Sequence, residues 1–268
     1  MCACARRAGL VLQVVTASAI ALAPVGAVAG AWTEPQGQGL MIETLWGFDG
    51  QGSPWGGEPG VKQNRADLQT YAEYGLNDQW TIFGQMAIER YELSRPESSL
   101  YAGLDYSDLG LLAKLWSAGN WVVSSEATLF LPGAWNPASP AQAGDTGGAA
   151  EARVLAGASF TLGPAPGFLD LELGYRFRSA GPPDECRMDV TVGLKPAPGA
   201  ILMLQDFLVV SMPSNNPSFP MWRQNVWQAS LVAPLRDRWQ LQIGYFQTSL
   251  AWKTNTERGA TVAAWRTF

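Results

Sequence analysis

Four arginines in three neighbouring stretches of the sequence are the residues whose chemistry best suits a solute-binding site: Arg153, Arg176, Arg178 and Arg187. A guanidinium group presents a planar fork of donors that matches carboxylate and phosphate groups. Charged residues around a pore also set its selectivity. One hypothesis is therefore an attraction site for an acidic or hydroxyl-rich saccharide. The alternative is a set of salt bridges that fills a narrow interior.

Acidic side chains accompany these arginines and would be their partners under the second interpretation: Glu151, Glu172 and Asp189. Glu126 is a further candidate for the interior wall. A hairpin that turns within residues 179–186 would bring three pairs together: Arg178 with Arg187, Arg176 with Asp189, and Asp170 with Lys195. These pairs depend on the register, because a slip of two residues would replace each partner. The pattern predicts a charged wall in the outer third of the protein's interior.

Hydrolytic chemistry is disfavoured because the sequence contains no histidine. Histidine is the usual general base of Ser-His and Asp-His hydrolysis. Four acids could face the interior, but solvated or paired acids are the more ordinary interpretation: Glu43, Glu73, Glu89 and Glu126. No phosphate-binding loop, dinucleotide fingerprint or zinc-ligand spacing is present. We predict no catalytic residue, no cofactor and no metal site.

The charged residues are positioned by strands with two different faces. In the segment 168–178, the odd-numbered positions from Leu169 to Phe177 are apolar, whereas the even-numbered positions include Asp170, Glu172 and Arg176. Residues 187–195 repeat this alternation. Side chains alternate across a β-strand, so each segment presents one apolar and one polar surface.

Twelve segments of this kind follow one another along the chain, at residues 39–48, 65–75, 80–89, 104–116, 121–131, 150–162, 168–178, 187–195, 200–211, 222–233, 239–248 and 259–268. Long connections are expected at 49–64, 94–103, 132–149, 179–186, 212–221 and 251–258. They alternate with short turns near 76–79, 117–120, 163–167, 196–199 and 234–238. Bacterial outer-membrane barrels have an even number of strands, short periplasmic turns and longer outer loops. We predict an all-β, antiparallel, up-and-down transmembrane barrel.

Aromatic residues stand at the start of the predicted strand after most of the short turns. We expect them to anchor the barrel at the membrane interface: Trp80, Trp121, Phe168 and Trp239. The aromatic last residue, Phe268, is similar to the signal that barrel-assembly machinery reads, although Arg266 interrupts its apolar face. The alternative is a secreted β-sandwich or jelly roll, which also has alternating strands. That fold would not concentrate aromatic residues at strand starts.

The first 29 residues are typical of a secretory signal peptide. Arg6 and Arg7 precede a short apolar stretch, and Ala27-Val28-Ala29 fits the small-x-small cleavage pattern. The alternative, a retained anchor, is disfavoured because the stretch is shorter than the roughly 20 residues of a spanning helix.

The net charge of −5 becomes more negative when both arginines are removed, which argues against a nucleic-acid partner. Cleavage would leave Cys186 as the single cysteine.

Two short stretches resemble XagA-like proteins: Gly30-Ala31-Trp32-Thr33-Glu34-Pro35-Gln36-Gly37-Gln38-Gly39 and Gly119-Asn120-Trp121-Val122-Val123-Ser124. The resemblance implies an outer-membrane barrel associated with exopolysaccharide and biofilm formation; it supplies no catalytic residues. The expected function is a channel or accessory export pore for small hydrophilic solutes or saccharide. Its expected partners are outer-membrane lipid, barrel-assembly machinery and a saccharide or acidic solute. A plugged structural or adhesive barrel is the alternative, and a barrel enzyme acting on lipid or glycan is less favoured.

Overall fold

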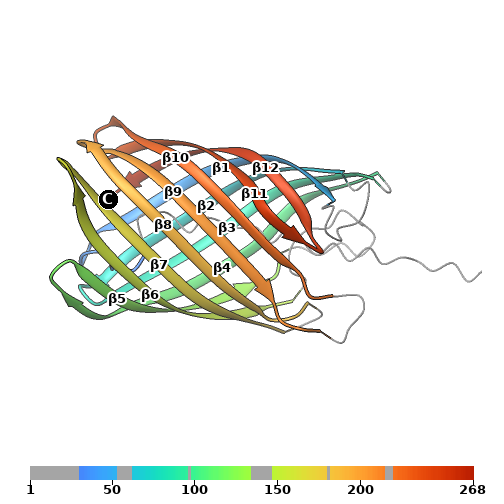
Figure 1. Cartoon of the computed structure of the whole chain (residues 1–268), viewed down its shortest axis with the longest axis horizontal. Helices are drawn as coiled ribbons and strands as arrows, with labels where there is room; N and C mark the ends of the chain where they lie inside the picture. The colour runs from blue at the N-terminus through green and yellow to red at the C-terminus, as the bar shows by residue number, and fades with distance from the viewer. Residues whose placement is uncertain (1–29, 53–61, 96–97, 134–146, 180–181, 215–219) are drawn as a thin grey trace, which may run out of the picture.

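The structure, a computed structural model, is a closed barrel of twelve antiparallel strands (Figure 1). It describes residues 30–52, 62–95, 98–133, 147–179, 182–214 and 220–268. The strands are β1 (Gly39–Gly52), β2 (Lys62–Asn77), β3 (Trp80–Arg95), β4 (Ser99–Ala118), β5 (Trp121–Leu131), β6 (Ala149–Leu162), β7 (Ala165–Arg178), β8 (Glu185–Ala197), β9 (Ala200–Ser211), β10 (Arg223–Arg236), β11 (Trp239–Trp252) and β12 (Asn255–Thr267). The predicted signal peptide lies outside the described residues.

The barrel closes between its first and last strands. Each strand pairs with its neighbours in the sequence, and β1 pairs with β12 from Leu40↔Thr267 to Gly52↔Asn255. The Gly39 N–H donates to the Phe268 carbonyl (3.0 Å), and the Phe268 N–H donates back to the Gly39 carbonyl (2.9 Å). Closure leaves no open sheet edge, which is the condition for a β-structure to span lipid.

The outer surface is apolar, and the inner surface carries most of the buried polar groups. On β7, Leu173 and Phe177 point outward and are more than half exposed, whereas Asp170, Glu172 and Arg176 point inward and are buried. Leucines cover the outside of other strands in the same way: Leu45, Leu109, Leu129 and Leu231. A soluble sandwich would bury this apolar face in its core. The molecule instead has the inside-out arrangement of an outer-membrane barrel.

All twelve predicted strands are confirmed, but two expected long loops are wrong. Strand β3 continues to Arg95 and β4 begins at Ser99; β11 continues to Trp252 and β12 begins at Asn255. These strands extend because backbone hydrogen bonding requires no apolar face, so pairing continues after the alternation fades. A spanning strand needs only about 9–11 residues, whereas β4 has 20. A strand of this length therefore extends beyond the bilayer.

No helix in the described ranges is long and apolar enough to cross a membrane.

Candidate functional site

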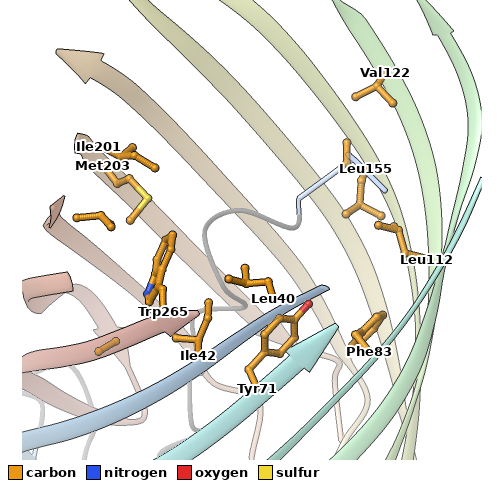
Figure 2. Close-up of a cluster of buried hydrophobic side chains, with 13 residues drawn as sticks. Leu40, Ile42, Tyr71, Phe83, Leu112, Val122, Leu155, Ile201, Met203 and Trp265 are labelled. Carbon is orange, nitrogen blue, oxygen red and sulfur yellow. The ribbon is translucent and has the colours of Figure 1, made fainter. Parts of the chain in front are cut away.

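The interior near the short turns is filled by apolar side chains. Leu40, Ile42 and Trp265 from the closure strands meet Leu155 from the opposite wall in one buried cluster. Figure 2 shows these side chains projecting inward from many strands. The indole N–H of Trp265 donates to the Gln242 side-chain oxygen at 3.0 Å. In an outer-membrane barrel this end faces the periplasm, because the short turns and both strand termini lie there.

Residues 30–38, which we call the N-terminal segment, enter this end of the barrel: residues 30–34 are buried or half-buried, whereas residues 35–38 are exposed. Ala31 is fully buried within the apolar cluster, and its carbonyl accepts a hydrogen bond from the Ser124 hydroxyl. The Glu34 N–H donates to the Thr81 hydroxyl (2.8 Å), and the Gly37 N–H donates to the Gly75 carbonyl (2.9 Å). These bonds attach the segment to β2, β3 and β5, so it obstructs the periplasmic entrance.

Two glycines in the wall make space for the N-terminal segment. A Cβ on Gly157 would overlap the Trp32 ring, and a Cβ on Gly75 would overlap the Pro35 carbonyl. Only glycine permits such a close approach of ring or backbone. The wall is therefore shaped to receive this segment.

Farther along the interior, Arg153 on β6 is the centre of a buried ion network. Its side chain is 5% exposed and lies 2.6 Å from a carboxylate oxygen of both Glu172 and Asp189. Its Nε also contacts Glu151, and Glu126 lies 3.8 Å away. Carboxylates from β5, β6, β7 and β8 thus converge on one guanidinium, and the network ties together four adjacent strands.

The other three predicted arginines extend this network outward. Arg176 Nε donates to Glu151 at 2.6 Å, and its guanidinium stacks over the Phe130 ring at 3.9 Å. Arg178 contacts Glu185 at 2.5 Å. Arg187 is less strongly held: its Nη1 is 3.7 Å from Glu185, and its buried Nε and Nη1 have no hydrogen-bond partner among the described residues. All four arginines are brought together, mostly paired with acids.

The predicted register between these strands is wrong. Arg176 pairs with Glu185 across β7 and β8, and Gly174 pairs with Arg187, so Arg178 does not face Arg187 and Arg176 does not face Asp189. The offset from the expected register is four residues. Because four is even, every side chain keeps its predicted inward or outward direction. The polar face could be read from the alternation, but the partners depended on where the outer connection ends and β8 begins.

The four expected interface aromatics separate into two groups. Trp80 and Trp121 are exposed on the outer face beside the short turns, and Trp239 lies beneath the Arg266 guanidinium at 5.4 Å. Phe168 is not an outer anchor. It occupies an even-numbered, inward position on β7 and packs edge-to-face against Trp32 at 6.1 Å.

A second buried ion network was not anticipated from the sequence. Arg65 on β2 is 1% exposed and contacts Asp67 at 2.7 Å, Asp105 at 2.8 Å and Glu89 at 3.1 Å. The sequence could have indicated an inward-facing cation here, because Arg65 lies on the polar face of the segment 65–75 and no other arginine or lysine lies in that segment. Across the described residues, ten acidic side chains and only four arginines are buried. The interior is therefore acidic.

Two cavities lie among the side chains described above. A cavity of about 440 Å³ lies beside the N-terminal segment and is lined by Trp32, Phe168, Asp170 and Lys195, among others. We call it the vestibule. A cavity of about 40 Å³ lies between Trp46, Asp67 and Phe246. It is comparable with the volume of one or two water molecules, so it is too small for a sugar.

The comparisons with known proteins agree with the barrel architecture. The chain is similar to the COG4313 outer membrane channel from Pseudomonas putida F1, with 14% sequence identity, a TM-score of 0.68, and coverage of 89% of this chain and 98% of that chain. The β domain of the Bordetella autotransporter Brka (12% identity, TM-score 0.49, 85% and 98% coverage) and the NanC porin (9% identity, TM-score 0.48, 83% and 98% coverage) are less similar. No family model matches the sequence, and no curated protein matches it. The closed barrel, its apolar exterior and its polar interior identify the chain as a bacterial outer-membrane β-barrel with the fold of a channel.

Proposed function

We propose that this protein is a narrow outer-membrane channel for small hydrophilic solutes, and that the docked N-terminal segment corresponds to its closed state. The observation that carries the proposal is the charged interior. Arginines and acids from β2–β8 line a continuous inner wall, whereas a barrel with a purely structural role could fill this space with apolar side chains. The ion pairs narrow the middle of this path, and the N-terminal segment closes it at the periplasmic end.

The acidic excess supports a preference for cations or neutral hydrophilic solutes. Arg153, Arg176 and Arg178 already contact carboxylates, so attraction of an acidic solute to them would compete with those pairs. Arg187 remains the candidate for an anion contact, because two of its nitrogens lack a hydrogen-bond partner among the described residues. A saccharide cargo is favoured by the resemblance to XagA-like proteins, and membership of that family is part of this proposal.

Measurements in planar bilayers and liposomes test the proposal. A variant that lacks residues 31–38 should conduct more strongly than the intact chain and admit small sugars in a liposome-swelling assay. Under a salt gradient, its reversal potential should indicate cation preference, because fixed charges around a pore select the opposite ion. An anion preference would contradict the charge argument.

Arg187→Gln in this shortened chain should increase the cation preference further. Arg90→Gln is the matched control, because Arg90 lies on the outer face in an exposed pair with Glu92. Equal reversal potentials for the two variants would remove Arg187 from the selectivity site.

The packed interior also supports the second candidate, a plugged structural or adhesive barrel. The same shortened chain distinguishes the two. If it still passes neither ions nor sugars although it is folded, the plugged barrel is correct and the channel proposal fails.

A further inference from the structure

Asp170 is unusual among the buried acids of this wall. It is 3% exposed, yet among the described residues no arginine or lysine forms an ion pair with it. By contrast, Glu151, Glu172 and Asp189 each contact an arginine within 2.6 Å or less. A buried charge requires a partner, because its hydration is lost. Asp170 lines the vestibule together with Glu172 and Lys195, and an ammonium group placed against its carboxylate would give it a direct ion pair.

The backbone of the N-terminal segment lies directly against this carboxylate. The Ala31 N–H donates to Asp170 Oδ1 at 2.8 Å. A Cβ on Gly30 would lie 2.7 Å from the Asp170 carboxyl carbon and 2.8 and 2.9 Å from its two oxygens. A larger side chain at position 30 would therefore have to displace the Asp170 carboxylate.

The sequence places the predicted signal cleavage between Ala29 and Gly30. Hydrolysis of that peptide bond by a periplasmic-side signal endopeptidase consumes one water, leaves a carboxylate on Ala29 and leaves an α-ammonium group on Gly30. The new positive charge would arise on the residue whose backbone already touches Asp170. Capture of an N-terminal amine is a known mode of recognition.

We propose that Asp170 is the binding site for the α-ammonium group of the processed chain, so that signal cleavage at Gly30 completes the closure of the periplasmic entrance. The ligand class is a primary ammonium, supplied by the protein itself. Before cleavage, the amide nitrogen of Gly30 carries no charge and would leave Asp170 buried without a cation. Cleavage would therefore add a charge pair to an arrangement that the uncleaved chain already adopts. This inference concerns maturation and does not depend on which solute is transported.

The test is direct chemistry on the α-amine of the mature protein in detergent. N-terminal sequencing should give Gly30-Ala31-Trp32. An amine-acylating reagent at near-neutral pH should label the α-amine of the folded protein at least about tenfold more slowly than that of the urea-unfolded protein, since a shift of one pKa unit changes the reactive fraction about tenfold. This comparison uses the wild-type chain and requires no conduction.

Variants sharpen the result. Asp170→Asn keeps an oxygen for the Ala31 N–H but removes the charge, and it should raise the labelling rate toward the unfolded value. Gly30→Ala keeps the charge but adds a methyl group that would displace the Asp170 carboxylate, and it should raise the labelling rate as well. Asp49→Asn is the matched control, because Asp49 binds Asn64 at the far end of β1; its rate should equal that of the wild type. A different mature N-terminus, or equal rates for folded and unfolded wild type, would overturn the proposal.

Discussion

Replacement of Arg153 by methionine removes the central cation of the largest ion network. Methionine keeps most of the side-chain length but leaves four carboxylates without their shared partner: Glu126, Glu151, Glu172 and Asp189. At an effective dielectric constant of about 20, an ion pair separated by 2.6 Å, as between Arg153 and Glu172, has a Coulomb energy of about 6 kcal/mol. Desolvation of the charges offsets part of it. In other proteins, breaking a buried ion pair lowers the free energy of unfolding by about 3–5 kcal/mol. We expect a loss of stability of that size for Arg153→Met.

The control for this prediction is Arg90→Met, which breaks an Arg–Glu contact of 3.0 Å on the outer surface. Both of its side chains are more than 40% exposed. Because water and salt screen such pairs, the expected loss is about 0–1 kcal/mol. Burial, and not contact distance, should account for the difference between the two variants.

The assay is urea unfolding in lipid vesicles, followed by tryptophan fluorescence. Arg153→Met should unfold at a lower urea concentration than both the wild type and Arg90→Met. The triple variant Arg153→Met, Glu172→Gln, Asp189→Asn should recover much of the loss, because it removes two of the stranded charges. If Arg153→Met and Arg90→Met are equally stable, or if the triple variant recovers nothing, the assignment of a buried and energetically important network is refuted.

Three further predictions concern the lipid-facing surface, the N-terminal segment and the closure between the first and last strands. Leu173→Arg places a cation on the lipid-facing side of β7 and should destabilise the folded protein by about 2–4 kcal/mol if the residue lies at the bilayer midplane, whereas Leu173→Met should be nearly neutral in the same unfolding assay. Burial raises the pKa of Glu34 above its ordinary value of 4.5, although a hydrogen bond with Glu73 opposes this shift; the docked N-terminal segment then binds a proton that a released segment would lose. Closure should therefore strengthen as the pH falls toward 4.5 and weaken as it rises, and single-channel recordings of Glu34→Gln should lose this dependence. Deletion of Phe268 removes both backbone bonds to Gly39 and should lower the yield of heat-resistant folded barrel on gel electrophoresis, whereas Phe268→Tyr should keep it.

Much of the architecture could be predicted from the sequence because a strand's side chains alternate with a period of two. The segment Phe168–Arg178 showed one apolar and one charged face, and these became the lipid-facing and inner faces of β7. The same alternation, repeated twelve times between short and long connections, identified the closed barrel. The inward direction of Arg153, Arg176 and Arg187 followed from it as well.

Pairing partners could not be read in this way. Alternation fixes the face of a residue but not its register, so Arg176 was expected opposite Asp189 and instead pairs with Glu185. Phe168 was predicted to be an interface anchor because it follows a turn. Its even number already placed it on the charged face of the strand, which is the inner face of the barrel. The network of Arg65 joins residues up to 40 positions apart, and no local pattern signals such a contact.

The strands, the direction of their faces and the barrel class could be inferred from the order of residues, because they depend on local periodicity and on the requirement that lipid contact apolar groups. Three features became visible only in the folded chain: the N-terminal segment turns back into the bore, its backbone binds Asp170, and most interior arginines are already paired with acids. These outcomes arise from contacts between distant strands, and they are set by closure of the barrel.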